Sequence, residues 1–323
     1  MSDLNRRDFL RAAAAVGATG AGLSTAIVAD ANAQPPQPRR KFTKCLSCGA
    51  IGVRADQREA IRLAHRFGFE AVEPSADFLA QLSQSQLQDL LEDMKSKRLV
   101  WGAAGLPVEF RTSDATFQEG MKGLPRTAEA LNRAGATRVA TWLGPSHPSL
   151  SYVQNFRQHA RRLREAAKVL GDHGQRLGLE YVGPKTSWAS GRFPFIHTMA
   201  EMKDLIAEIG QGNVGFLLDS WHWYTAGETE ADLLTLTNRD VVCVHLNDAP
   251  AGIPVDRQID SKRDLPCATG VIDVKAFLGG LLKIGYDGPI LVEPFSQKLN
   301  AMPAEQAVAT TAAAMNKAFA LIE

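Results

Sequence analysis

Four side chains of the kind that bind metal ions each come at or near the end of a short apolar run. They are Glu180, Asp219, His245 and Glu293. In three of these runs, every second residue is apolar until the last member, which is the Asp, the His or the second Glu. If the four side chains converge, the three carboxylates repel one another unless a cation or protons lie between them. One imidazole with three carboxylates suits a hard or borderline divalent ion such as Mn²⁺, Mg²⁺ or Co²⁺.

The elements that would position these residues alternate between strand and helix. Apolar runs, polar loops and amphipathic stretches follow one another eight times. The expected strands are 42–46, 71–73, 99–103, 138–143, 179–182, 214–218, 241–246 and 289–292. The expected helices are 56–67, 83–97, one that ends near 134, 152–177, 199–209, 228–236, 274–284 and 304–321. This pattern predicts an α/β fold in which residues 41–323 form a single (β/α)₈ TIM barrel.

A barrel would bring the four residues together at one mouth. In such a fold, alternate strand residues face the interior, and functional groups stand at the carboxyl ends of the strands. The four residues close the fifth to eighth expected strands. A salt-bridged strand end is the ordinary explanation for any one of them, but not for four in succession. A doubly wound sheet is the alternative fold, although no G-x-G-x-x-G supports dinucleotide binding.

The first 33 residues have the features of an export signal. Arg6 and Arg7 form a twin-arginine pair, a weakly apolar stretch covers 12–29, and Ala-Asn-Ala at 31–33 supplies a small-x-small cleavage site. We therefore expect a signal peptide at 1–33, a proline-rich tether at 34–40 and a periplasmic mature protein. The alternative is an uncleaved membrane anchor, for which the stretch is short and rich in glycine.

Composition excludes some partners. The 323 residues carry 36 Lys and Arg against 35 Asp and Glu, a formal net charge of +1, and 45% of them are apolar. There is no basic excess to neutralise a phosphate backbone, so we expect no nucleic-acid partner. After removal of the signal we also expect no stable membrane association. Homo-oligomerisation stays open.

The four cysteines allow more than one interpretation. Cys45 and Cys48 form C-x-x-C, but no helix start follows directly, as a thioredoxin-like motif needs. We interpret them as small apolar residues near the end of the first strand. A disulfide is the main alternative in an exported protein, and redox chemistry or metal binding is a further one.

Four segments resemble the xylose-isomerase-like barrel superfamily, which includes sugar isomerases and epimerases, inosose dehydratases and endonuclease IV. They are L-E-Y-V-G-P-K-T around Glu180, L-L-D-S-W-H-W around Asp219, V-H-L-N-D-A-P around His245 and G-Y-D-G-P-I-L-V-E-P-F around Glu293. The resemblance covers essentially residues 41–323. In ketose 3-epimerases the matching Glu, Asp, His and Glu bind one divalent ion, and the two glutamates also transfer protons. The resemblance thus implies that Glu180 and Glu293 are catalytic.

The sequence departs from these relatives at two places. Ketose 3-epimerases have an arginine six residues after the histidine of the seventh strand, where this chain has Ala251. Arg257, or else Arg263, would then have to reach the substrate from the loop. Endonuclease IV uses additional histidines on the second and third strands, which end here in Glu73 and in the stretch 102–105. The resemblance therefore implies one metal ion and not three.

Further polar and aromatic residues near the strand ends are candidates for substrate contacts. His222, Lys185, Asp248 and Glu73 could each bind a sugar, and Asp248 could instead orient His245. The other candidates are His147 and the tryptophans Trp188, Trp221 and Trp223, for which a loop role and core packing are the respective alternatives. The long loop 249–270 is expected to form a lid or substrate wall.

Two classes of function fit these residues. The leading hypothesis is a sugar isomerase or epimerase with one divalent metal ion, Mn²⁺ first and Mg²⁺, Co²⁺ or Zn²⁺ as alternatives. A lyase or dehydratase acting on a keto-glycoside or cyclitol is the close alternative, since it also begins with proton abstraction beside a carbonyl. A non-catalytic periplasmic sugar-binding protein belongs to another class, but it would not need both glutamates on a metal ion.

Overall fold

In the computed structural model, which describes residues 39–323, nine strands form one parallel sheet that curls on itself, and β6 Ser146–His147 pairs antiparallel with β8 Phe193–Pro194 in a second, small sheet. The order of the strands is β3-β2-β1-β11-β10-β9-β7-β5-β4. Their bounds are β1 Thr43–Leu46, β2 Ala71–Val72, β3 Val100–Trp101, β4 Ala104–Gly105, β5 Arg138–Trp142, β7 Arg176–Glu180, β9 Val214–Asp219, β10 Val241–His245 and β11 Pro289–Leu291.

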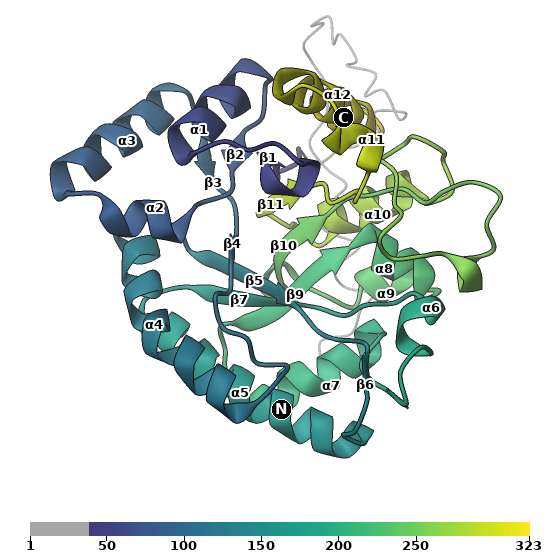
Figure 1. The fold of residues 1–323 in the computed structure, drawn as a ribbon. Coiled ribbons are helices and arrows are strands. Elements are labelled where there is room, and N and C mark those ends of the chain that lie inside the picture. The colour runs from purple at the N-terminus through teal and green to yellow at the C-terminus, as the bar shows by residue number, and fades with distance from the viewer. Residues whose placement is uncertain (1–38) are drawn as a thin grey trace, which may run out of the picture. The chain divides into compact units, whose positions relative to one another are not determined.

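The two strands at the ends of this order are the halves of one interrupted strand. β3 pairs with β2, and β4 pairs with β5 only two residues further along the chain. The predicted third strand therefore exists in two parts, and it joins the first and last strands of the order into a barrel with eight positions. This confirms the predicted α/β TIM barrel, whose helices lie around the outside of the strands (Figure 1).

Helices follow most strands, as the sequence pattern predicts. The α-helices are α1 Gln57–Arg66, α2 Ala76–Gln81, α3 Gln84–Ser96, α4 Asp114–Arg133, α5 Tyr152–Asp172, α6 Lys185–Trp188, α7 Met199–Ile209, α8 Ser220–Thr225, α9 Glu230–Leu233, α10 Val274–Lys283, α11 Gln297–Asn300 and α12 Ala304–Phe319. The described residues also form short 3₁₀ turns, which are η1 Gly49–Ile51, η2 Asn238–Asp240 and η3 Val255–Arg257. Within residues 39–323, none of the helices combines the length and the apolar character that crossing a bilayer requires.

Local capping explains where the long helices begin. Ser83 and Thr198 each accept a hydrogen bond from a backbone N–H in the first turn, and Gln86 and Glu201 return the bond to the cap residue. Gly210 then ends α7 in a left-handed conformation, with φ of 66°. The bounds of α7 coincide with the predicted helix 199–209.

The boundary before the fifth strand differs from the prediction. We expected a helix to Leu177 and a strand at 179–182, but α5 ends at Asp172 and β7 begins at Arg176. The turn is at Gly174, whose φ is 74°. Gly178 lies inside the strand, where a Cβ atom would stand 3.1 Å from the Cβ of Val242. Close packing against the neighbouring strands, and not a turn, accounts for this glycine.

The barrel interior confirms the alternation on which the site prediction depended. Leu217 and Cys243 pack together with Ala103, and Leu291 packs with Cys45. All four cysteines are free, and three of them are buried. The interpretation of Cys45 as a small apolar residue is confirmed. One detail was wrong, because the short turn η1 does begin directly after Cys48.

A buried hydrogen bond joins the end of the fifth strand to the helical side of the barrel. The Tyr181 hydroxyl donates to the Glu228 carboxylate, which also accepts the backbone N–H of Met199 at 2.6 Å. Burial raises the pKa of Glu228 from its ordinary 4.5 to about 7, although both hydrogen bonds act in the opposite direction. The protonated form of Glu228 is therefore the one that the fold favours.

This raised pKa predicts how stability depends on pH. The contribution of Glu228 is fully present below about 4.5 and is lost as pH rises through about 7, a difference of about 3 kcal/mol. Glu228→Gln keeps an acceptor oxygen but does not ionise. We expect the free energy of unfolding of the variant, relative to that of the natural protein, to be higher at pH 8 than at pH 5. Urea unfolding at the two pH values measures this difference. An equal difference at the two pH values would contradict the prediction.

Candidate metal centre

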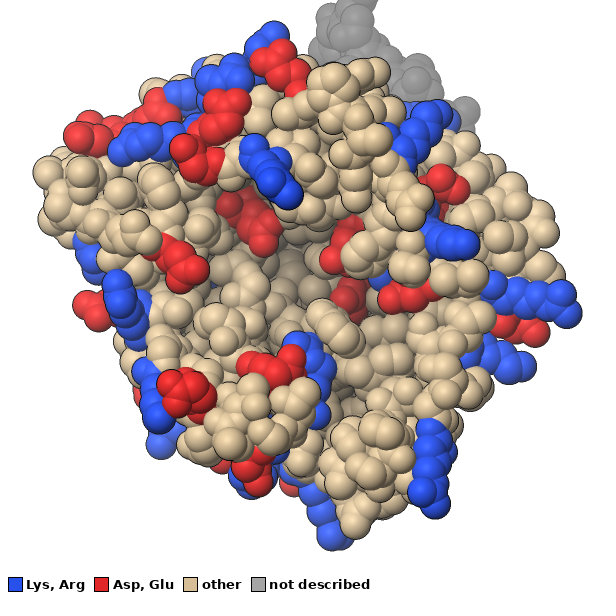
Figure 2. All heavy atoms as spheres, viewed as in Figure 1, with Lys and Arg blue, Asp and Glu red and all other residues tan. Residues whose placement is uncertain are grey.

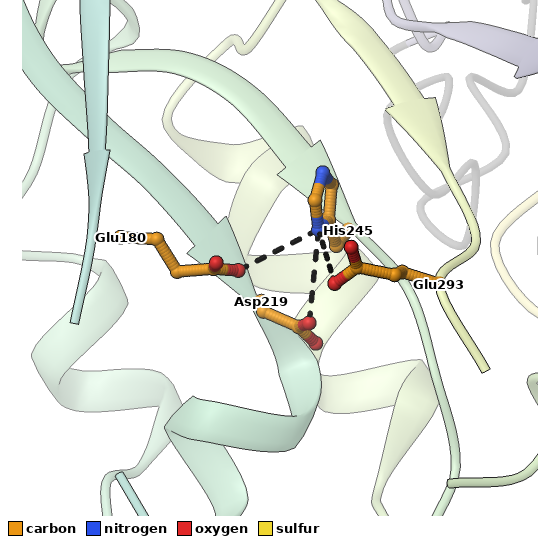
Figure 3. Close-up of side chains that lie close together, drawn as sticks. All are labelled: Glu180, Asp219, His245 and Glu293. Carbon is orange, nitrogen blue, oxygen red and sulfur yellow. Dashed lines mark ion pairs between the residues drawn. The ribbon is translucent and has the colours of Figure 1, made fainter. Parts of the chain in front are cut away.

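The four predicted ligand residues come from neighbouring strand ends. Glu180 ends β7, Asp219 ends β9, His245 ends β10, and Glu293 follows the last residue of β11 by two. The strand register places His245 beside Asp219 on one side and beside Leu291 on the other. Figure 3 shows the four side chains pointing toward one another from these adjacent elements.

The ligand atoms meet around the imidazole. His245 Nδ1 lies 3.5 Å from Glu180 Oε1, 3.5 Å from Glu293 Oε2 and 3.8 Å from Asp219 Oδ2. One possible ligand atom from each residue lies within 4.8 Å of all the others. The structure thus brings together all four side chains that the sequence singled out.

Two of these ligand atoms test whether the site fits an ion. Glu180 Oε1 and His245 Nδ1 are buried and have no hydrogen-bond partner among the described residues. A buried polar atom without a partner is costly, and a bound cation would satisfy both at once. The donor set of one imidazole nitrogen and three carboxylates also matches divalent ions. The residues present therefore fit a divalent ion.

The pKa values of Glu180 and His245 are shifted because the site is buried and its carboxylates are crowded together. Burial raises the pKa of Glu180 far above its ordinary value, and Glu293 and Asp219 add to the effect. Burial alone would lower the pKa of His245, but the surrounding carboxylates outweigh it and raise this pKa to about 9. These are the responses expected when several carboxylates share a largely buried site.

Asp219 is held by residues that sequence reasoning largely missed. The Asn247 amide donates to both carboxylate oxygens at 3.0 Å, and the Trp221 backbone N–H donates to one of them at 2.8 Å. Asn247 also accepts the Glu293 backbone N–H at 2.9 Å, so it fixes two of the four ligand residues. It stands two residues after His245, and that spacing was the available signal.

An arginine from the long loop enters the site. Arg263 is almost fully buried, and its guanidinium donates to Asp219 Oδ2 at 2.7 Å and to Glu293 Oε2 at 3.1 Å. Its other terminal nitrogen donates to Asp260 Oδ1 at 2.8 Å. Arg257, our first choice for a substrate contact, is instead exposed on η3. The loop thus supplies the arginine that we had named as the alternative.

His222 lies beside Glu180. Its Nδ1 lies 3.2 Å from the Gly183 backbone nitrogen, and its Nε2 lies 3.8 Å from Glu180 Oε1. Burial, followed by Arg263 and His245, holds the pKa of His222 well below its ordinary value. The ring is therefore neutral. Arg263 Nη2 lies 3.3 Å from its Nε2, and because a neutral ring has only one acceptor nitrogen, it accepts from either Gly183 or Arg263 but not from both.

Asp248 serves the loop and not the cavity. Its carboxylate is fully buried and accepts the backbone N–H groups of Ala249, Thr269, Gly270 and Ile272. These bonds tie together the two ends of the loop that carries Arg263. We had expected Asp248 to orient His245 or bind a sugar hydroxyl, but its oxygens are used for loop closure.

The other residues predicted to contact the substrate lie at the barrel mouth, on the surface, in the core or in a loop. Glu73 lines the barrel mouth and accepts the Ser47 hydroxyl, and burial raises its pKa. Lys185 is exposed at the start of α6. Trp221 and Trp223 are buried in the core, and Trp188 stacks on His197. His147 accepts the backbone N–H groups of Ser149 and Leu150, which is a loop role.

Two cavities adjoin the four residues. One measures ≈ 610 Å³ and the other ≈ 170 Å³, and Trp142, Glu180 and Glu293 line both. Figure 2 shows the face of the molecule hollowed near its centre, with acidic side chains around the hollow. Trp142 and Phe295 are exposed aromatic residues of the larger cavity that sequence reasoning missed. The pairing of β5 with β7 places Trp142 in register with Glu180.

Two family models match the chain. The model described as xylose isomerase-like TIM barrel matches residues 61–318. The model for the twin-arginine translocation pathway signal sequence matches residues 3–22.

Curated relatives include isomerases and dehydratases. An inosose isomerase from Bacillus velezensis is 23% identical over 78% of this chain and 88% of its own. A 3-dehydroshikimate dehydratase from Pseudomonas aeruginosa is 28% identical over 44% of this chain, but over only 21% of its own.

Solved structures share the fold. A xylose isomerase domain protein from Alicyclobacillus acidocaldarius is 33% identical, with a TM-score of 0.76 over 87% of this chain and 99% of that one. The IOLI protein, solved with a zinc atom, is 19% identical, with a TM-score of 0.72 over 87% and 99%. A D-psicose 3-epimerase from Clostridium cellulolyticum, solved with D-tagatose, is 17% identical, with a TM-score of 0.65 over 84% and 95%.

Proposed function

The chain belongs to the xylose isomerase-like TIM barrel family, and on that premise we propose that it is a metal-dependent sugar isomerase or epimerase. The substrate class is a free sugar or sugar derivative with a carbonyl group. Relatives named as an inosose isomerase and a D-psicose 3-epimerase support this class of reaction. The observation that carries the proposal is the convergence of Glu180 Oε1 and His245 Nδ1, both buried and without a partner among the described residues.

One divalent ion is held by the four converging residues. Glu180, Asp219, His245 and Glu293 supply the ligands, and Mn²⁺ is the ion that we propose first because carboxylates predominate. The zinc atom of the IOLI structure supports a divalent ion in this family and keeps Zn²⁺ as an alternative. When bound, the ion polarises a carbonyl or hydroxyl of the substrate, which makes a neighbouring C–H more acidic.

The two glutamates move the proton. Glu180 and Glu293 reach the site from β7 and from the segment after β11, and both line the two cavities. A sugar placed between them has a carboxylate available on each side. One removes the proton from the carbon beside the carbonyl, and the other returns a proton, on the opposite face in an epimerase. His222, neutral and lining the larger cavity, is placed to hydrogen-bond a sugar oxygen.

Elimination is the second candidate reaction. A lyase would begin with the same proton removal but would expel a β-leaving oxygen instead of returning the proton. The 3-dehydroshikimate dehydratase among the relatives favours this possibility, although the shared segment is only a fifth of that protein.

The test combines metal content with hydrogen exchange. After dialysis, elemental analysis should find one divalent ion per chain. With Mn²⁺ added, incubation of a ketose panel in D₂O should introduce deuterium beside the carbonyl, detected by NMR. Bound sugar without any deuterium incorporation would support a non-catalytic binding protein and contradict the proposal.

The export signal leads to a separate prediction. The twin-arginine signal sequence directs the chain to export, which in bacteria leads to the periplasm. We propose that cleavage follows Ala33, so that the mature protein begins at Gln34. N-terminal sequencing of periplasmic material is the measurement. A cytosolic protein that keeps Arg6 and Arg7 would contradict it.

A further inference from the structure

The two cavities meet at the residues that we assign to proton transfer. Glu180, Glu293 and Trp142 line both. His245 lines only the smaller cavity, whereas Arg263 and His222 line only the larger one. A ligand that fills both cavities would therefore pass beside the two glutamates.

The smaller cavity has roughly the volume of one sugar, and the larger cavity has room for more than one. A hexose occupies about 180 Å³ if each CHOH group has roughly the share of one water molecule, about 30 Å³. The smaller cavity, at ≈ 170 Å³, has the size of one such ring. The larger one, at ≈ 610 Å³, has about three times that space. A monosaccharide alone would leave most of the larger cavity to water.

The smaller cavity has the lining of a site for one polar ring. Ala103, Ala104 and Gly105 leave room at the barrel mouth because their side chains are minimal. Ser47 and Glu73, which are hydrogen-bonded to each other, supply polar groups for hydroxyls. The side chains that could hold an ion lie at its edge. The carbonyl-bearing unit of the substrate belongs here.

The larger cavity has an aromatic platform. Trp142 is 49% exposed, and the Arg111 guanidinium lies over its ring at 4.3 Å. Arg111 is itself held by Glu109 and by the Trp142 carbonyl oxygen, which keeps the stack in place. Phe295 is 43% exposed, and Arg263 lies over its ring at 4.7 Å. Exposed aromatic residues in a cavity offer flat surfaces for the C–H face of a sugar.

Hydroxyl groups complete the larger cavity. Ser146, Thr186, Ser187 and Ser190 all line it. A wall with both aromatic and hydroxyl groups suits a second sugar, which has an apolar face and polar edges. The Thr186 and Ser190 hydroxyls already donate to the backbone oxygens of Gln258 and Ser187, but a purely aromatic unit would offer no hydrogen bond to any of the four.

We propose that the substrate is a disaccharide-sized glycoside with one sugar in each cavity. The unit that carries the carbonyl lies in the smaller cavity, the second sugar stacks on Trp142 in the larger one, and the linkage passes beside Glu180 and Glu293. This inference rests on the proposed function, since it specifies the substrate of the same site.

The test compares ketose disaccharides with their ketose. D-Fructose is titrated by calorimetry into the Mn²⁺-loaded mature protein beside turanose, maltulose, leucrose and isomaltulose, in which glucose is attached at different oxygens of fructose. We expect at least one disaccharide to bind about tenfold more tightly than fructose. Trp142→Ala should weaken binding of that disaccharide about tenfold, which is the loss that corresponds to an aromatic contact of about 1.4 kcal/mol.

One further variant tests the larger cavity, and another serves as a control outside both cavities. Ser187→Phe narrows this cavity and should weaken binding of the disaccharide more than binding of fructose. Tyr152→Ala removes an exposed aromatic residue outside both cavities and should change neither affinity. The proposal is overturned if no disaccharide binds more tightly than fructose, or if Ser187→Phe weakens both ligands equally.

Hydrogen exchange separates this proposal from the proposed function. Deuterium incorporation into fructose without any disaccharide preference leaves the isomerase assignment intact and overturns the two-unit substrate. A disaccharide preference that Ser187→Phe lowers, without exchange in any sugar, supports the two subsites and contradicts the isomerase. Tighter binding of p-nitrophenyl glucoside than of every disaccharide would instead indicate an aromatic second unit and overturn the proposal.

Discussion

Glu180→Gln and Glu293→Gln should each lower turnover by about 10²–10⁴-fold, and at least one should stay inactive at saturating Mn²⁺. Glutamine keeps the size of the side chain and one acceptor oxygen, but it cannot accept the proton. Loss of a metal ligand alone would be partly corrected by excess ion, whereas loss of the base would not. Turnover measured over a series of Mn²⁺ concentrations separates the two effects.

Matched measurements strengthen this test. Glu208→Gln, an exposed carboxylate on α7, should leave turnover unchanged. In an epimerase, one of the two site variants should still exchange substrate hydrogen with solvent without inverting the centre, because one face keeps its base. If both variants recover full turnover with added Mn²⁺, neither glutamate is the base, and His222 becomes the leading candidate.

His245→Ala should lower the affinity for Mn²⁺ by at least about 100-fold. Outer-shell partners of metal ligands already contribute about 10–100-fold, so direct loss of the single nitrogen ligand should exceed that. The three carboxylates would remain crowded around an ion with one ligand fewer. Calorimetric titration with Mn²⁺ gives the affinity, and elemental analysis gives the stoichiometry.

Controls separate a lost ligand from a lost fold. His65→Ala, on the exposed side of α1, should bind Mn²⁺ like the natural protein. His245→Gln restores a neutral donor of similar reach and should recover part of the affinity. Unchanged Mn²⁺ binding in His245→Ala, with circular dichroism showing a folded barrel, would mean that the ion is held elsewhere.

The alternation of residues along the strands made the four ligand positions predictable. Asp219, His245 and Glu293 each continue the inward face of an apolar run, and the barrel places such positions at one mouth. The prediction of these positions needs only local periodicity and the closure of the barrel. An error of several residues in the predicted start of the fifth strand therefore did not affect it.

The rest of the site depends on contacts that spacing does not encode. Arg263 reaches Asp219 only because the loop 249–270, which carries it, is folded back and held by Asp248. Trp142 became visible as a cavity residue only through the pairing of β5 with β7, which sets it beside Glu180. Neither long-range pairing nor the path of a loop is present in the local pattern, so both residues required the structure.

The closure of the loop by Asp248 has a consequence for engineering. One carboxylate holds Ala249 close to Thr269 and Gly270, so the loop leaves and rejoins the barrel at a fixed point. The entropy of closing a loop grows slowly, by about 0.6 kcal/mol for each doubling of its length. Segments of other lengths can therefore be exchanged between these anchors, with Arg263 retained, in a library that varies the cavity wall while the barrel framework stays constant.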